Sequence, residues 1–406
     1  MFKRRSLSRK ILITTIALII IKTLSFIPIF RINPYILSDL ADKNNLFSLM
    51  NVFSGNGIKR FSVASLGIGP YITASIIIQL SATIFNHIDR LANNGEYGKR
   101  KLDKYIFIMF VFLAAFNSWG IIKYLVSARL IANTNVNMVI AVLSLTLGSI
   151  IIVLLSKLID KYGFGDGVSV ILFLNAITTI LTAFVDLGLE SWSNKFNIKY
   201  IIIIVALVLL LVYSFYIDKK KHMIPITSSR IIANFDDSYI PVKFNINGVM
   251  PIIISTTMMS LPGSIAMILG KEENMVLKTL NANNWFDLKN PIFSLGYLVF
   301  VVLMLVFSIY YAKISYDPVE VALNMKESGI SVEGLNTTKK TIDYLSELVA
   351  RIAYKSCFAM IGISTIPMIL NRLVEADIAL SGTSFVIVST VFYNLIQEWK
   401  FWRIAL

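Results

Sequence analysis

Side chains that could carry out covalent chemistry or bind a metal are scarce and scattered along this chain. Its 406 residues include one cysteine, Cys357, inside an apolar run, and two histidines, His87 and His222, in separate loops. One cysteine cannot form an intramolecular disulfide, and two histidines are too few for a histidine-rich metal site. Phosphate-loop, H-E-x-x-H and nucleophile-elbow motifs are also missing from the sequence. We therefore expect neither catalysis nor a cofactor.

Charged and glycine-rich motifs do not change this expectation. The stretch 163–167, Gly-Phe-Gly-Asp-Gly, follows an apolar segment rather than a strand, so it predicts a tight turn and not a nucleotide loop. No carboxylate relay of the kind that proton-coupled transporters often use lies within the apolar segments. The charged residues that do lie there are mostly near segment ends, where long side chains can reach the lipid headgroups: Lys22, Lys123, Lys313, Arg351 and Lys355.

The composition of the chain indicates which elements must position its side chains. Apolar residues make up 56% of the sequence and charged residues 15%, with a mean hydropathy of +0.71. A soluble domain carries about a quarter charged residues. The apolar residues fall in blocks that approach the roughly 20 residues needed to cross a bilayer as a helix. These features exclude a soluble enzyme, a disordered protein and a disulfide scaffold, and they predict an all-α polytopic membrane protein.

Ten membrane-spanning helices are predicted from the apolar blocks. The basic segment 1–10 resembles the start of a signal peptide, but the apolar run after it is long and no small-residue cleavage site follows. We therefore interpret the first block as a retained helix. The ten predicted spans are 11–30, 68–86, 105–127, 137–156, 168–187, 199–217, 248–269, 292–314, 351–370 and 378–396.

The charge pattern predicts the orientation of these spans. An even number of spans places both termini on the same side of the membrane. If that side is cytoplasmic, the inner segments hold roughly twice as many Lys and Arg as the outer segments, as the positive-inside rule requires. The net charge of +14 is thus explained by orientation rather than by nucleic-acid binding. Two long cytoplasmic loops, 218–247 and 315–350, could form a platform for a soluble partner, or could be solvated connectors.

A helix-breaking pattern occurs twice at corresponding positions. Residues 67–70 and 248–251 both read Gly-x-x-Pro, and each proline is followed five residues later by a hydroxyl side chain, Ser75 or Thr256. These motifs begin the second span of each group of five, so the second group must be inverted relative to the first. Such repeats point to a central pathway between the halves. We expect an N-terminal half at 1–195 and a C-terminal half at 196–406.

Small and flexible residues precede the first of these motifs. The stretch Phe53, Ser54, Gly55, Asn56 and Gly57 cannot form a full span. It could be a short re-entrant piece, which is tolerated at membrane depth only where protein or water covers it. The alternative is a plain external loop, which the composition alone slightly favours.

Several motifs follow one another along nearly the whole chain. They include the second-span stretch Phe-Ser-Val-Ala-Ser-Leu-Gly-Ile-Gly-Pro-Tyr-Ile-Thr-Ala-Ser-Ile-Ile-Ile-Gln-Leu and the basic loop Gly-Glu-Tyr-Gly-Lys-Arg-Lys. The full series is 61–80, 95–101, 162–169, 241–251, 317–318, 328–329 and 381–384. Taken together, these motifs resemble the SecY family, whose members form the central subunit of a protein-conducting channel.

This resemblance implies ten helices in two inverted halves around an hourglass pore that also opens sideways to lipid. A plug would occupy about 46–60, which favours the re-entrant interpretation. Polar side chains at the sideways opening would be Thr73, Asn117 and Thr256. A ring of aliphatic side chains would gate the pore by excluding water. The corresponding ring residues would be Ile68, Ile72, Leu172, Ile253 and Ile387.

The resemblance also implies partners. Because the chain lacks an ATP site, a SecA-type ATPase would dock on the two cytoplasmic loops, and SecE-like and SecG-like subunits would brace the halves. A ribosome is a further candidate partner, and unfolded preproteins would be the cargo in a plasma membrane. No nucleic-acid partner is expected. The residues expected to meet the motor are Lys219, Lys220, Lys221, Arg230, Asn336, Lys339 and Lys340.

Three departures from the family pattern bear on the motor. Asn336 follows Gly334 and Leu335 where the family usually has an arginine, and it cannot make the same charge-assisted contact. The tail after the last span is short, and Asp166 replaces the usual asparagine. These departures indicate an accessory SecY of Gram-positive bacteria with its own SecA paralogue and surface-glycoprotein clients. The alternative class is a secondary transporter of a small solute, which would need a polar central lining.

Overall fold

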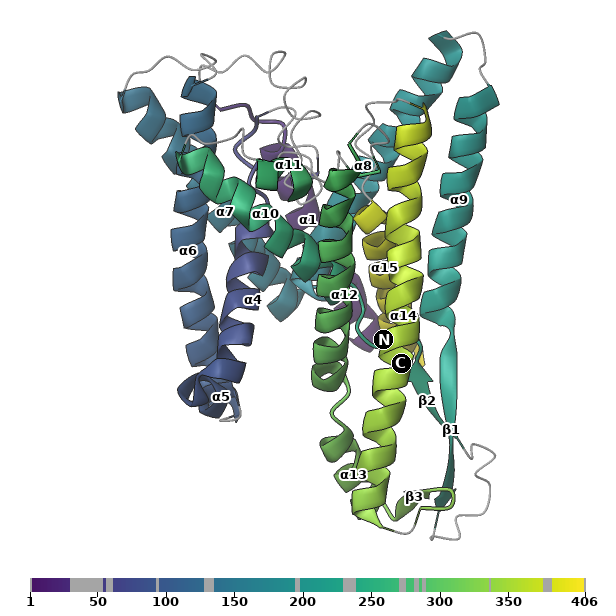
Figure 1. The fold of residues 1–406 in the computed structure, drawn as a ribbon. Coiled ribbons are helices and arrows are strands. Elements are labelled where there is room, and N and C mark those ends of the chain that lie inside the picture. The colour runs from purple at the N-terminus through teal and green to yellow at the C-terminus, as the bar shows by residue number, and fades with distance from the viewer. Residues whose placement is uncertain are drawn as a thin grey trace.

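The computed structural model describes residues 2–29, 54–55, 61–92, 95–127, 135–193, 198–228, 239–269, 275–280, 285–286, 290–335, 337–374 and 382–404. Within these residues, ten long helices form one bundle, and each overlaps one of the ten predicted spans (Figure 1). The ten helices are α1 (Phe2–Leu24), α4 (Gly69–Ile84), α6 (Gly95–Ser127), α7 (Asn135–Tyr162), α8 (Gly167–Ser193), α9 (Ile198–Lys219), α10 (Met250–Leu269), α12 (Ser294–Ser315), α14 (Thr338–Val374) and α15 (Gly382–Ile404).

Six segments of the described chain are long and apolar enough to cross a membrane. Their mean hydropathies run from 1.4 to 2.8, and they include α7, α8 and α9. Because lipid offers no hydrogen bonds to the backbone, such apolar runs must satisfy their own amide groups, and the helix does this within one segment. Helix α7 leaves Leu143, Leu147, Leu154 and Leu158 exposed, which is unfavourable in water and expected of a face against lipid.

One large hydrophobic core connects the two halves of the chain. All ten long helices contribute buried residues to it, from Ala17 and Ile21 in α1 to Phe385 and Ile387 in α15. Short helices lie between the long ones along the chain. They are α5 (Asn86–Ala92), α11 (Met275–Leu280), η2 (Pro291–Phe293) and α13 (Pro318–Glu327).

The two long loops, predicted as connectors or a platform, fold together as one unit. Strands β1 (Lys221–Ser228) and β2 (Tyr239–Lys243) come from the first loop, and β3 (Ile330–Val332) comes from the second. The sheet order is β2-β1-β3, and both pairs are antiparallel. This sheet was not anticipated from the sequence. Figure 1 shows it beside α13 at the same end of the bundle as the beginning of α14.

This unit has its own small core, which we call the platform core. Ile224 and Val242 from the sheet pack with Ala322 and Met325 from α13 and with buried residues of α14. Helix α14 therefore begins at Thr338, well before the predicted span at 351, because its first turns cover the sheet. The basic stretch 95–101, expected as a loop, is likewise the first part of α6.

The turn predicted at 163–167 joins α7 to α8. Gly165 has φ +85°, a conformation that L side chains rarely adopt. Asp166 then caps α8, because its Oδ2 accepts hydrogen bonds from Ser169 N at 2.9 Å and from Ser169 Oγ at 2.5 Å. Asp and Asn are comparable helix caps. Asp166 therefore fills the local capping role that the usual asparagine could fill.

The beginning and the end of the described chain lie at one end of the bundle. Lys10 Nζ lies 4.1 Å from the centroid of the Trp402 ring, which joins α1 to α15. Glu398 Oε1 also accepts a hydrogen bond from Gly165 N at 3.4 Å. The two ends of the chain and the α7–α8 turn therefore share one face, as an even number of spans requires.

Candidate functional site

The two Gly-x-x-Pro motifs have the same local structure. Gly67 has φ +56° and Gly248 has φ +58°, and α4 and α10 each begin two residues later. Pro70 and Pro251 are the second residues of these helices, where the missing amide hydrogen costs nothing. Since the two motifs lie in different halves, their matching backbone supports the predicted repeat.

A close backbone contact fixes the beginning of α4. Helix α7 packs tightly on the segment that precedes α4. A Cβ at Gly148 of α7 would lie 2.0 Å from the carbonyl oxygen of Val63 in that segment. The next residue, Ser149, donates a hydrogen bond to Gly67 O at 2.9 Å. Residues of α7 thus hold the segment that presents Ile68 and Ile72.

Two asparagines fix the beginning of α10, and we call them the asparagine anchors. Asn245 Nδ2 donates to Asp218 Oδ1 at 2.7 Å, and the buried Asp218 carboxylate also accepts from hydroxyls of α15. Asn247 Nδ2 donates to Ser308 Oγ at 2.6 Å, and Ser308 Oγ donates to Ala353 O at 3.2 Å. The segment before α10 is therefore tied to α9, α15, α12 and α14.

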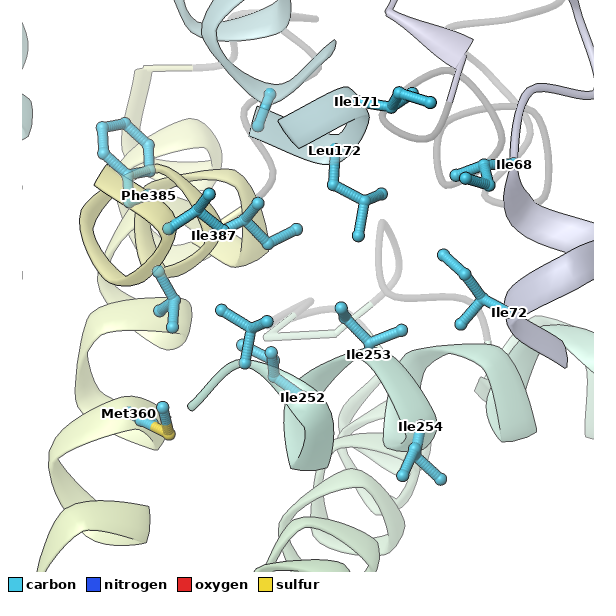
Figure 2. Close-up of a cluster of buried hydrophobic side chains, with 14 of the residues drawn as sticks. Ile68, Ile72, Ile171, Leu172, Ile252, Ile253, Ile254, Met360, Phe385 and Ile387 are labelled. Carbon is cyan, nitrogen blue, oxygen red and sulfur yellow. The ribbon is translucent and has the colours of Figure 1, made fainter. Parts of the chain in front are cut away.

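The five residues expected to form the ring are all aliphatic and buried, and they belong to the large hydrophobic core; we call these five residues the collar. Their side chains are at most 6% exposed. In Figure 2, Ile72, Leu172 and Ile253 point toward one another from three helices, with Ile68 beside Ile72 and Ile387 on the other side. The collar thus draws on α4, α8, α10 and α15. Among the described residues, no group of three or more His, Cys, Asp or Glu could hold a metal ion.

The plug expectation is only partly within the described residues. Phe53, Asn56 and Gly57 lie outside them, whereas Ser54 and Gly55 are buried. Gly55 has φ +60°, and a Cβ there would lie 2.6 Å from Asn175 Oδ1 and 2.8 Å from Lys22 Nζ. Lys22 Nζ is thus buried inside the protein instead of extending to the headgroups as expected.

The polar side chains expected at the sideways opening differ in what they contact. Thr73 Oγ1 donates to Gly69 O at 3.1 Å, and Thr256 Oγ1 donates within its own helix at 2.9 Å. Each hydroxyl has one proton, so neither donates across the seam between the halves. Asn117 lies half-buried on α6, which packs against α10.

A contact that sequence reasoning missed does cross this seam. Tyr311 of α12 donates a hydrogen bond through its hydroxyl to Gln79 Oε1 of α4. Gln79 Nε2 in turn donates to Ser75 Oγ at 3.1 Å. Gln79 and Ser75 lie within the second-span signature, but nothing in the sequence indicated their partner on α12.

The lysines expected to meet the motor lie at the platform. Lys219, Lys220 and Lys221 are exposed where α9 meets β1, and Lys339 and Lys340 are exposed in the first turn of α14. Arg230 and Asn336 lie outside the described residues.

The sequence pattern of the SecY family matches residues 62–396. The chain belongs to the SecY family. Among curated relatives, the protein translocase subunits SecY of Staphylococcus aureus and Staphylococcus epidermidis are each 28% identical, over 95% of this chain and 92% of theirs.

Solved structures share the fold of this chain. A protein-conducting channel has a TM-score of 0.75 at 16% identity, covering 98% of this chain and 93% of its own. A SecY structure described by its plug domain has a TM-score of 0.76, and Sec61 of the canine ribosome–channel complex one of 0.72, both at 16% identity and the same coverage. The chain is thus a multi-pass membrane protein with the ten-helix fold of these channels, and a channel subunit rather than an enzyme.

Proposed function

We propose that this chain is the pore-forming subunit of a plasma-membrane protein translocase, with the collar as its gate. The observation that carries the proposal is the convergence of Ile72, Leu172 and Ile253 in one buried aliphatic cluster (Figure 2). An aliphatic constriction excludes water and ions when it is empty. It also makes no sequence-specific contact, so it can yield to polypeptides of many compositions.

The collar separates this function from the transport of a small solute. A solute site needs a few polar groups placed to fix the ligand, near the middle of the membrane. The five collar side chains are aliphatic, and a pathway lined in this way offers a solute no hydrogen bond. Ser54 and Gly55 belong to the plug, which covers the outer side of the collar in this proposal.

The platform is the docking surface for a SecA-type ATPase. Pairing of β1 with β3 joins the two loops into one unit with its own core, which a solvated connector would not need. The exposed lysines at positions 219, 220 and 221 would attract an acidic surface of the motor. With the platform in the cytoplasm, both termini are cytoplasmic too. SecE-like and SecG-like subunits brace the two halves, and a ribosome is an alternative ligand of the same surface.

The accessory assignment rests on Asn336. Its neighbours Gly334 and Thr337 are exposed, and Gly334 has φ +79° in a turn that follows β3. An arginine at position 336 would add a charged donor that asparagine lacks. We propose that the chain works with a dedicated SecA paralogue on a narrow set of surface glycoproteins.

Reconstitution tests the proposed function. Proteoliposomes that contain the complete complex and the SecA paralogue should move a client preprotein into a protease-protected space when ATP is added. The general SecA should bind the wild-type chain weakly, and Asn336→Arg should strengthen that binding while Thr337→Arg should not. Equal binding of both motors to the wild-type chain contradicts the accessory assignment. Flux of a small solute without protein transport contradicts the channel.

A further inference from the structure

The hydrogen bond between Tyr311 and Gln79 joins helices from opposite halves of the chain. Helix α4 belongs to the N-terminal half and α12 to the C-terminal half. Tyr311 is 6% exposed and lies in the large core, whereas Gln79 is exposed on α4. Gln79 Oε1 supplies a hydrogen-bond acceptor for the hydroxyl of this largely buried tyrosine, which would be unfavourable without a partner.

Gln79 is prepared for this contact by its own helix. Its Nε2 donates to Ser75 Oγ one turn earlier, at 3.1 Å. This bond orients the amide so that Oε1 faces the tyrosine hydroxyl. Ser75, Gln79 and Tyr311 therefore form a short polar chain across the seam.

The position of this polar chain relative to the collar matters. Gln79 follows Ile72 by seven residues, which places it about 10 Å further along α4. That direction leads toward α5, and Tyr311 likewise lies near the end of α12 that leads toward α13. Figure 1 shows α5 and α13 toward the same end of the bundle as the sheet. The contact therefore lies on the platform side of the collar.

We propose that Tyr311 and Gln79 form a latch that holds the seam closed on its cytoplasmic side. The inference rests on the proposed function and names how its lateral opening is regulated. An apolar signal segment that enters between α4 and α12 must separate these two side chains. In exchange it offers apolar contact to both helices. Thr73 and Thr256, whose protons are used within their own helices, play no part in this latch.

The size of the effect follows from the strength of such bonds. Hydrogen bonds between membrane helices shift an equilibrium by about fivefold. A latch of this strength can bias the seam toward the closed state, and a signal segment can still overcome it. Loss of the latch should therefore raise the transport rate most for a preprotein whose signal segment is short or only weakly apolar.

Tyr311→Phe tests the latch, because it removes one hydroxyl and keeps the ring. Tyr310→Phe is the matched control, since Tyr310 is the neighbouring tyrosine and its ring contacts Tyr311 edge-on. In the reconstituted complex, the initial rate of transport is measured for a preprotein with a shortened apolar signal. We expect Tyr311→Phe to raise this rate about fivefold over wild type, and Tyr310→Phe to leave it unchanged.

A second variant guards against a folding effect. Gln79→Leu should raise the same rate to a similar extent, and the double variant should show no further increase, since both changes break one bond. Equal rates for Tyr311→Phe and Tyr310→Phe, or additive effects in the double variant, overturn the latch. The proposed function is tested separately, by transport of a preprotein with an intact signal through the wild-type complex. If that transport occurs, the proposed function holds whether or not the variants support the latch.

Discussion

Ile72 and Ile253 occupy equivalent positions in the two halves of the chain. Each lies five residues after a glycine with positive φ, Gly67 or Gly248, and each points into the same aliphatic cluster (Figure 2). The repeated motif thus does two things at once. It begins a helix beside the cluster, and it places a branched aliphatic side chain one turn inside that helix.

The asparagine anchors should be needed for stability. Asn245→Ala removes a donor from the buried Asp218 carboxylate and should lower the free energy of unfolding by about 1 to 3 kcal/mol. Asn394→Ala is the control, because it breaks only the exposed bond from Lys243 Nζ at 3.1 Å. Thermal unfolding of the purified protein in detergent measures both. An equal loss of stability in the two variants would mean that the anchor adds nothing beyond a surface contact.

The close packing of α7 on the start of α4 should make Gly148 irreplaceable. Gly148→Ala puts a methyl group 2.0 Å from Val63 O, so the backbone before α4 must move. We expect a loss of about 1 to 3 kcal/mol or more, together with a raised resting ion leak. Gly188→Ala in α8 is the control, since a Cβ there meets nothing within 4 Å. The idea fails if the melting temperature of Gly148→Ala matches that of Gly188→Ala.

The platform should depend on its own core rather than on the membrane bundle. Val332 is 2% exposed in β3, whereas the neighbouring Ser331 is exposed. Val332→Asp buries a carboxylate and should unfold the sheet at a cost of several kcal/mol, and Ser331→Asp should be tolerated. Motor binding should be lost only in Val332→Asp, while both variants should still insert into membranes. Motor binding retained in Val332→Asp would locate the docking surface elsewhere.

This substitution is a cleaner test than deletion of 218–247. That range contains Asp218, Asn245 and Asn247, which fix the beginning of α10. A deletion would therefore disturb the collar helix together with the docking surface. Loss of motor binding after the deletion would not distinguish the two causes.

The spans and the two motifs could be predicted because their signals are local. Apolar blocks of sufficient length form helices in lipid, and Gly-x-x-Pro fixes the backbone at a helix start whatever lies around it. The collar residues are single Ile and Leu side chains in apolar runs. They could be assigned only through resemblance to a family, since composition alone does not distinguish a gate from a core.

The remaining features depend on residues that are distant in sequence. Pairing of Thr227 in β1 with Ser331 in β3 joins segments more than a hundred residues apart, so neither loop alone indicated a sheet. Tyr311 and Gln79 meet for the same reason only in the folded bundle. For Thr73 and Thr256 the sequence suggested polar groups at the sideways opening, but both hydroxyls donate within their own helices. A hydroxyl in a helix can always donate to the preceding turn, so its type alone does not indicate a partner on another helix.

The resting ion conductance of reconstituted channels tests the collar most directly. Ile72→Gly combined with Ile253→Gly removes the two equivalent side chains and should leave a wettable gap in the closed channel. The control is Ile254→Gly, one residue further along α10, because the buried Ile254 side chain is not one of the five collar residues and points away from Leu172 in Figure 2. The account predicts a conductance well above the wild-type closed level for the double variant and near that level for the control. A double variant that stays as tightly sealed as wild type would contradict the claim that these aliphatic side chains close the pore.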